Sequence, residues 1–253
     1  GASCEMEEIS QLSKKYGFKI IEDASHAIGG SYKEHPVGSC KFSDLCIFSF
    51  HPVKIITTGE GGIITTNNEF LHAKLKSLRS HGIEKDSEKF EFHTIQPWIY
   101  EMQELGFNYR MNDFQAALGL SQLKRLGSII EKRNYIYEFY KKGLVDLPLK
   151  LLKIPNNVKS SVHLCVVQLT NSFKKEHLNL FNFLISQNVG VQVHYSPVHL
   201  QPYYRKLGFK EGDFKISEDY SKKSISLPVF ETLSNKDLEK IINLLNLYFH
   251  NKI

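Results

Sequence analysis

The sequence predicts an α/β protein with a mainly parallel sheet covered by helices, followed by a smaller α+β domain. Three observations predict this fold class. Short apolar runs alternate with helical periodicity as far as Tyr140, polar side chains follow the apolar runs, and the pattern then changes. Pro148 and Pro155 interrupt it, so we expect one domain over residues 1–145 and a second over 146–253.

The first domain is predicted to alternate helices and strands. Ser3 can cap a helix with an acidic first turn, and Gly17 ends that helix. The apolar runs at 18–21, 45–50 and 62–66 predict buried strands. Helices are expected after the turn at 67–68, after a cap at Asn112 or Asp113, and over 129–140.

The second domain is predicted to have fewer helices and strands than the first. The sequence predicts a strand over 163–169, a helix over 174–187, a strand over 190–195 and a C-terminal helix from Ser234. This order of elements is typical of a small α+β domain.

Composition excludes several classes of protein. The chain has 253 residues, of which 42% are hydrophobic and 23% charged, which is enough for a packed core and unlike a disordered chain. The net charge of +5 is spread along the chain, and we find no nucleic-acid-binding motif, membrane span or signal peptide, so we expect a cytoplasmic protein. The 4 cysteines show no metal-ligand spacing with the 11 histidines, so we expect reduced thiols and no metal site.

Two residues at predicted strand ends indicate a specific chemistry. Lys54 follows the strand that ends near Ser49 and precedes the glycine-rich segment 59–62, and Asp23 ends a neighbouring strand. A lone lysine would normally be a solvated surface residue. Pyridoxal phosphate, however, needs a lysine amine for a Schiff base and a carboxylate that keeps its pyridine nitrogen protonated. Ser49 is a candidate donor to the phosphate.

His26 lies three residues after Asp23. Its imidazole could contact the cofactor ring, or it could be an ordinary hydrogen-bonded histidine of the core. The sequence leaves both interpretations open.

Three motifs together identify a resemblance. The segments 15–27, 49–62 and 106–111 (Gly-Phe-Asn-Tyr-Arg-Met) resemble the DegT/DnrJ/EryC1/StrS family of sugar aminotransferases. The resemblance implies the fold type I of pyridoxal-phosphate-dependent transferases, and pyridoxal 5'-phosphate as the cofactor. It also implies that this family extends upstream of Gly1, so we expect the chain to lack the first part of the large domain and to bind the cofactor weakly by itself.

The resemblance also implies roles for individual residues. Lys54 would be the Schiff-base lysine and proton carrier, and Asp23 the partner of the pyridine nitrogen. The other cofactor contacts would be His26, Ser49 and, on the cofactor of the partner subunit, Asn108, which implies a homodimer with shared sites. Because Lys54 is present, a related dehydratase chemistry that uses histidine at this position is not expected.

The segments 97–106 and 192–204 are similar to the branch of the family that acts in pseudaminic acid biosynthesis. This implies amino transfer from glutamate to C4 of a UDP-linked 4-keto-6-deoxy-N-acetylhexosamine. His194 and Tyr195 would line the sugar pocket, although ordinary packing at a strand end is an alternative. Two alternatives remain: an aminotransferase that acts on a different nucleotide-linked keto-sugar, or a non-catalytic remnant of the fold.

Overall fold

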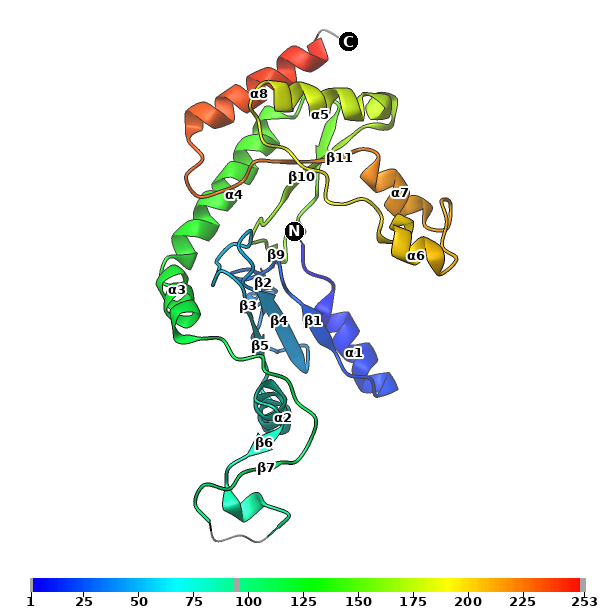
Figure 1. Ribbon diagram of the computed structural model, residues 1–253. Coiled ribbons are helices and arrows are strands. Elements are labelled where there is room, and N and C mark those ends of the chain that lie inside the picture. Colours follow the sequence, from blue (N-terminus) through cyan, green and yellow to red (C-terminus); the bar gives the residue numbers. More distant parts are fainter. Residues whose placement is uncertain (1, 93–95, 251–253) are drawn as a thin grey trace. The chain divides into compact units, whose positions relative to one another are not determined.

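The computed structural model describes residues 2–92 and 96–250, which form two compact units (Figure 1). The N-terminal unit comprises Ser3–Leu126, and the C-terminal unit comprises the chain from Gly127 onward together with Ala2. None of the described helices is both long enough and apolar enough to cross a membrane.

In the N-terminal unit, five short strands follow one another between the first two helices, so helices and strands do not alternate there as predicted. In chain order its elements are α1 (Met6–Tyr16), β1 (Ile21–Asp23), β2 (Ser31–Tyr32), β3 (His35–Pro36), β4 (Leu45–Ser49), β5 (Gly62–Thr65), α2 (Glu69–Arg79), β6 (Ile83–Glu84), the 3₁₀ helix η1 (Ser87–Lys89), β7 (Glu101–Met102) and α3 (Asp113–Leu123).

Local signals explain where these helices begin and end. Gly17 ends α1 in the left-handed conformation, with φ of 73°, as predicted. The helix begins at Met6 and its cap position is Glu5, so the predicted Ser3 cap is wrong; the Ser3 hydroxyl instead donates to the carbonyl of Cys4. Asn112 caps α3 in a reciprocal capping box with Gln115, which confirms the first of the two predicted caps.

The central sheet of the N-terminal unit has the strand order β1-β4-β5. Strands β1 and β4 are parallel, with Asp23 opposite Ile47, whereas β4 and β5 are antiparallel, with Ser49 opposite Gly62. The expectation of a mainly parallel sheet is therefore met only between β1 and β4. The chain returns from β4 to β5 through a loop instead of a crossover helix, and such a connection joins antiparallel strands.

The C-terminal unit is built around an antiparallel sheet with the order β11-β10-β8. Its elements are α4 (Leu126–Gly143), β8 (Leu149–Leu151), β9 (Val158–Lys159), β10 (Cys165–Leu169), the 3₁₀ helix η2 (Asn171–Glu176), α5 (His177–Ser186), the 3₁₀ helix η3 (Val198–Leu200), α6 (Pro202–Lys206), α7 (Lys215–Ser221), β11 (Ser224–Leu227) and α8 (Asn235–His250).

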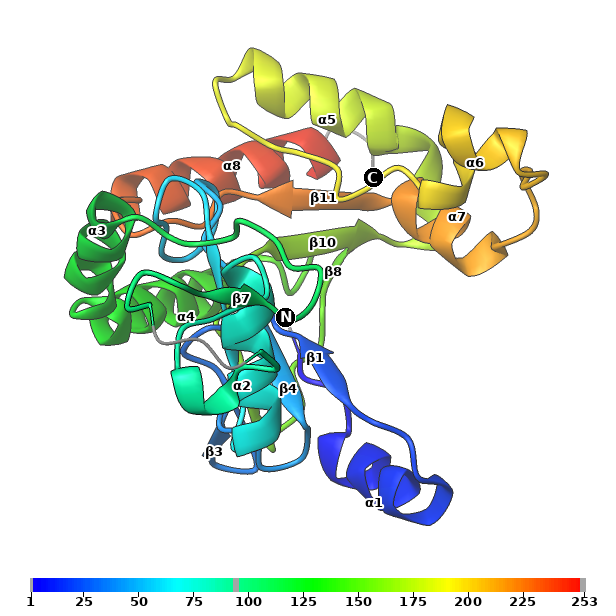
Figure 2. The ribbon, with the colours of Figure 1, turned by 60° about the horizontal axis from the view of Figure 1, so that its bottom comes forward.

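One hydrophobic core holds the C-terminal unit together. Helices α5 and α8 lie side by side (Figures 1 and 2), with the rings of Phe183 and Tyr248 5.1 Å apart between centroids. Helix α4 contributes Ile136 and Tyr140, both fully buried, and the Tyr140 hydroxyl donates to the carbonyl of Pro228. Because α4 packs into this core, the units divide at the start of α4, between Leu126 and Gly127, and not at the predicted 145/146 boundary.

The predicted strand over 190–195 is reduced to one antiparallel bridge, between Gln192 and Ser226. The two residues exchange both backbone hydrogen bonds, of 3.4 and 2.7 Å. Beyond Gln192 the chain leaves the sheet and turns through Pro197 into η3, so the ladder stops there.

Candidate active site

Asp23 ends β1 at the carboxyl end of the parallel β1–β4 pair, and its carboxylate is exposed. The next residue is fixed, because the backbone N–H of Ala24 donates to the carbonyl of Ile47. The Asp23 carboxylate accepts two hydrogen bonds from Ser25, one from its hydroxyl at 2.5 Å and one from its backbone N–H at 3.1 Å.

These contacts set the charge of Asp23. The hydrogen bonds from the Ser25 hydroxyl and backbone lower the pKa of the Asp23 carboxyl, and the charges of His26 and Lys54 lower it further. The side chain is therefore ionised at neutral pH. The charges of His26 and Lys54 thus act on the Asp23 carboxyl in the same direction as the hydrogen bonds from Ser25.

Lys54 lies in the loop between β4 and β5, residues 50–61, here called the lysine loop. Hydrogen bonds join the beginning of this loop to its end. The carbonyl of Phe50 accepts hydrogen bonds from the Thr57 hydroxyl at 2.8 Å and from the Thr58 N–H at 3.0 Å, and the Phe50 N–H donates to Gly61. Ile55 and Ile56 are buried beneath it, whereas the Lys54 side chain is only half-buried.

Helix α3 holds the lysine loop from outside. The Gln122 amide pairs with the backbone of Thr57 in both directions: it accepts from the N–H at 3.1 Å and donates to the carbonyl at 3.2 Å. About two turns earlier on the same face of α3, the Gln115 amide donates to the carbonyl of Glu60. The backbone around Lys54 is thus fixed at several points.

The end of the loop requires glycine at two positions. A Cβ on Gly61 would lie 2.4 Å from the Thr58 hydroxyl oxygen, and the φ of Gly61 is 149°. A Cβ on Gly62 would lie 2.7 Å from the carbonyl oxygen of Phe48. These contacts give a structural reason for the glycine-rich segment that follows the lysine.

The other predicted cofactor contacts of the N-terminal unit lie on separate segments. Ser49 is the last residue of β4, half-buried, and its hydroxyl oxygen lies 3.4 Å from the His51 N–H that donates to it. His26 is half-buried in the turn after β1. Asn108 is exposed and forms a backbone bridge with Ser80, at the base of the arm that contains β6 and β7.

His194 and Tyr195 belong to the C-terminal unit. The His194 ring nitrogen Nδ1 lies 2.7 Å from the Ser226 hydroxyl, and burial lowers the pKa of His194, which favours the neutral ring at neutral pH. Tyr195 is 62% exposed and its ring packs edge-on against the His194 ring. The His194 ring is therefore held by a hydrogen bond, whereas the Tyr195 ring is open to solvent.

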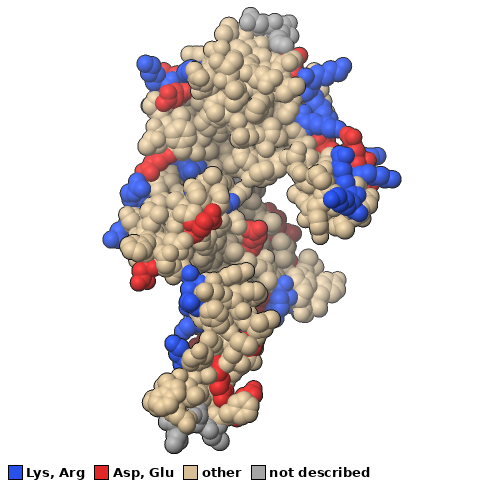
Figure 3. Space-filling model, in the orientation of Figure 1, with Lys and Arg blue, Asp and Glu red and all other residues tan. Residues whose placement is uncertain are grey.

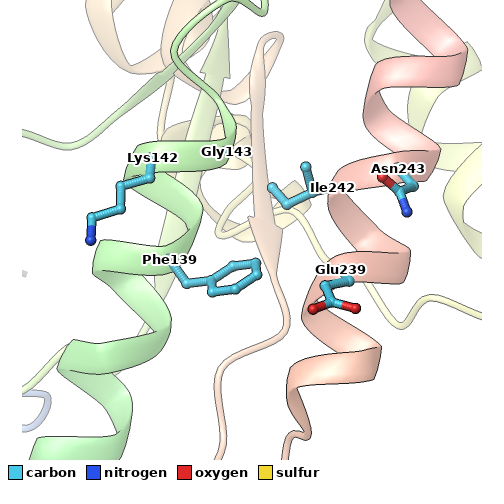
Figure 4. Close-up of a pocket in the computed structure, with 6 residues that line it drawn as sticks. All are labelled: Phe139, Lys142, Gly143, Glu239, Ile242 and Asn243. Carbon is cyan, nitrogen blue, oxygen red and sulfur yellow. The ribbon is translucent and has the colours of Figure 1, made fainter.

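No group of three or more metal-ligating side chains occurs among residues 2–92 and 96–250. On the face drawn in Figure 3, lysines and arginines are interspersed with acidic residues. A groove of about 550 Å³ lies between α4 and α8, with the Phe139 and Ile242 side chains on its walls (Figure 4). None of the predicted site residues lines this groove.

A model of the DegT/DnrJ/EryC1/StrS aminotransferase family matches residues 1–246. The chain belongs to this family. The resemblance of its three motifs is thereby confirmed, and the fold is that of solved family members: the Helicobacter pylori PseC structure, an "aminotransferase involved in the biosynthesis of pseudoaminic acid", is 32% identical with a TM-score of 0.86. That match covers 98% of this chain and 64% of PseC.

Other DegT/DnrJ/EryC1/StrS proteins show similar relationships. A UDP-4-amino-4,6-dideoxy-N-acetyl-beta-L-altrosamine transaminase from Campylobacter jejuni is 43% identical over 240 residues, covering 94% of this chain and 60% of the relative. Spr1654 from Streptococcus pneumoniae, solved in its PLP form, is 26% identical with a TM-score of 0.86 and covers 99% of this chain and 66% of Spr1654. Pyridoxal phosphate is the cofactor of this family. The chain thus spans less than two thirds of each of these relatives.

Sequence reasoning did not identify two residues that shape the candidate site. Ser25 binds the Asp23 carboxylate, and a serine two residues after an aspartate is a recognisable turn signal. Gln122 pairs with Thr57 across 65 positions of sequence, and no local pattern could have indicated that contact.

Proposed function

We propose that this chain forms part of a pyridoxal-phosphate-dependent aminotransferase of fold type I, which moves an amino group from glutamate to C4 of a UDP-linked 4-keto-6-deoxy-N-acetylhexosamine. The observation that supports it most is geometric: Asp23 ends β1 at the carboxyl end of the parallel β1–β4 pair, and the loop that contains Lys54 follows the end of β4. The 43% identity to a transaminase named for the corresponding amino sugar supports the choice of substrate.

The residues present fit the cofactor. An ionised carboxylate is the partner that a protonated pyridine nitrogen requires, and the two Ser25 hydrogen bonds keep Asp23 ionised. The Ser49 hydroxyl can donate to a phosphate. When bound, pyridoxal phosphate supplies an electron sink for the carbanion that forms next to the amino group.

In this proposal, Lys54, Asp23 and His26 have separate roles in the reaction. The Lys54 amine is the nucleophile that holds the cofactor, and after its release it carries the proton at the reacting carbon. Asp23 holds the ring-nitrogen proton, and His26 contacts the ring. The clamped backbone of the lysine loop keeps the Lys54 amine within reach of a single reacting centre, which is the geometric requirement for proton transfer.

The proposed enzyme is a homodimer whose subunits share their active sites. The arm, described over residues 83–92 and 96–110, exposes several large rings: Trp98 is 74% exposed, and Phe107 stacks on the 71% exposed Tyr109 at 4.8 Å. Exposed apolar groups of this size typically mark an association surface. Asn108 lies between these two stacked rings in sequence, so an arm that docks on a second copy would bring Asn108 to that copy.

The assignment of Lys54 is tested with the full-length protein. Incubation with pyridoxal phosphate followed by borohydride should attach the cofactor covalently to the peptide that contains Lys54. A Lys54→Ala variant should lose the adduct and the amino transfer, whereas the exposed Lys41→Ala should keep both. Labelling elsewhere, or transfer by the Lys54→Ala variant, would contradict the assignment, and no adduct in the wild type would favour a non-catalytic remnant.

The substrate is tested by product analysis. Incubation with glutamate and the UDP-linked 4-keto sugar should give a product with an amino group at C4, identified by mass and by NMR coupling constants. Turnover only with a different nucleotide-linked keto-sugar would keep the aminotransferase and replace its substrate.

The shared site is tested by mixing two inactive variants. If Asn108 serves the partner's cofactor, dimers of one Lys54→Ala and one Asn108→Ala subunit contain one intact site, and mixing should restore transfer. If Asn108 acts within its own subunit, no intact site forms and the mixture stays inactive.

A further inference from the structure

The segment from Gln192 to His199 in the C-terminal unit is fixed at both ends by polar contacts. At its start, Gln192 exchanges backbone hydrogen bonds with Ser226 of β11, and the His194 ring contacts the hydroxyl of the same serine. At its end, the His199 ring nitrogen Nε2 lies 2.9 Å from Oε1 of Glu218 on α7. Between these anchors, Tyr195 and Ser196 are exposed.

The second anchor is a buried pair of ionisable side chains. His199 and Glu218 are only 8% and 6% exposed. The same Glu218 oxygen also accepts from the backbone N–H of Gly212 at 2.8 Å and from that of Phe214 at 3.4 Å. Burial alone would raise the pKa of Glu218, but the bonds from His199, Gly212 and Phe214 outweigh it and lower the pKa.

This arrangement is not explained by stability alone. A buried polar pair of this kind adds little net stability, because burying both side chains removes them from water, whereas removing one partner is costly. What the pair does fix is geometry. The Glu218 oxygen joins η3, the turn around Gly212 and α7 at a single point, and the His199 ring packs 4.8 Å from the Phe214 ring.

We infer that His199 and Glu218 are positioning residues that hold Tyr195 and Ser196 in place for the keto-sugar. The inference rests on the proposed function, and it deepens it by assigning substrate specificity to a pair that does not itself touch the sugar. The buried Pro197 and the two anchors restrict the backbone between them, so the exposed Tyr195 ring is presented in a fixed position.

The test uses the full-length enzyme with its cofactor and the variants Glu218→Gln and His199→Gln. Each removes one partner of the pair. The matched control is Asp219→Asn, which lies next to Glu218 on α7 and removes the surface ion pairs of Asp219 with Lys174 and Lys223. Displacing a substrate contact by about 1 Å can cost a hundredfold, so we expect KM for the keto-sugar to rise about tenfold or more. The glutamate half-reaction, followed by cofactor absorbance in a single turnover, should be unchanged.

Hydrogen exchange provides a readout that does not depend on turnover. The amides of residues 195–201 should exchange faster in both single variants than in the wild type or in Asp219→Asn. The double variant His199→Gln with Glu218→Gln can restore an amide–amide hydrogen bond, and it should recover part of the protection and of the sugar affinity. It also provides a second measurement if a single variant does not fold.

Three results would overturn the inference: unchanged exchange and KM in the single variants, an equal loss in both half-reactions, or effects matched by Asp219→Asn. Failure of the proposed function is seen separately, as a wild-type enzyme that does not transfer the amino group to the sugar. In that case the exchange comparison still decides whether the pair positions the segment.

Discussion

The contact between Gln122 and Thr57 should control both the stability of the lysine loop and the capture of the cofactor. In the full-length protein, Gln122→Met keeps the length of the side chain and removes both hydrogen bonds, of 3.1 and 3.2 Å. A typical hydrogen bond contributes about 1 kcal/mol net, so the loss of two predicts a destabilisation of about 2 kcal/mol. For a domain of this size that corresponds to a fall in Tm of about 4–8 °C.

Two measurements check this prediction. Differential scanning calorimetry of the protein without cofactor gives the change in Tm, and the growth of the cofactor's absorbance band gives the rate at which Lys54 captures it. We expect both to fall, because the unclamped loop samples more backbone conformations. The same substitution at the exposed Gln187, in the other unit, is the control. A Tm and a capture rate that match this control would refute the role of the clamp.

Three further outcomes are expected. Ser25→Ala should raise the pKa of the Asp23 carboxyl in an NMR titration; because that pKa is depressed in the folded state, Asp23 favours folding above its unfolded-state pKa and loses this contribution as the pH falls through the folded value. Leu245→Ala, at a fully buried position of α8, should lower the free energy of unfolding by about 2–5 kcal/mol in urea titration, and a smaller change would mean that the core collapses around the site. A thiol reagent at pH 8 should label the exposed Cys4 rapidly and leave Cys46 unlabelled, because burial raises the pKa of the Cys46 thiol to about 12; rapid loss of two or more thiols would contradict this.

Features of the fold with local chemical causes could be predicted from the sequence. Gly17 and Asn112 define helix ends through their own backbone conformation and hydrogen bonds, which depend on a few neighbouring residues. The Lys54 loop and the Asp23 strand end could be predicted for the same reason, since each follows directly from an apolar run.

Features that depend on distant contacts could not be predicted. The division between the units lies at the start of α4 because Tyr140 packs into a core completed by β11 and α8, and its hydroxyl bonds to a carbonyl 88 positions away. The strand predicted over 190–195 is reduced to a single bridge because after Gln192 the chain leaves the sheet and turns into η3, where His199 contacts Glu218 on α7. In both cases, local propensity was overridden by a tertiary contact that a short window of sequence does not contain.

The candidate site combines a hydrogen-bonded loop backbone with a half-buried lysine side chain. A lysine that must bond to a cofactor, release it and then move a proton needs freedom at its amine but not at its Cα. The lysine loop meets both conditions, because Thr57, Thr58 and Gln122 fix its backbone while the Lys54 side chain is only half-buried. Most of this fixation comes from the hydroxyl and amide groups of other residues. If Lys54 has the proposed role, substitutions at Thr57 or Gln122 should slow transfer, whereas substitution of Lys54 should remove it.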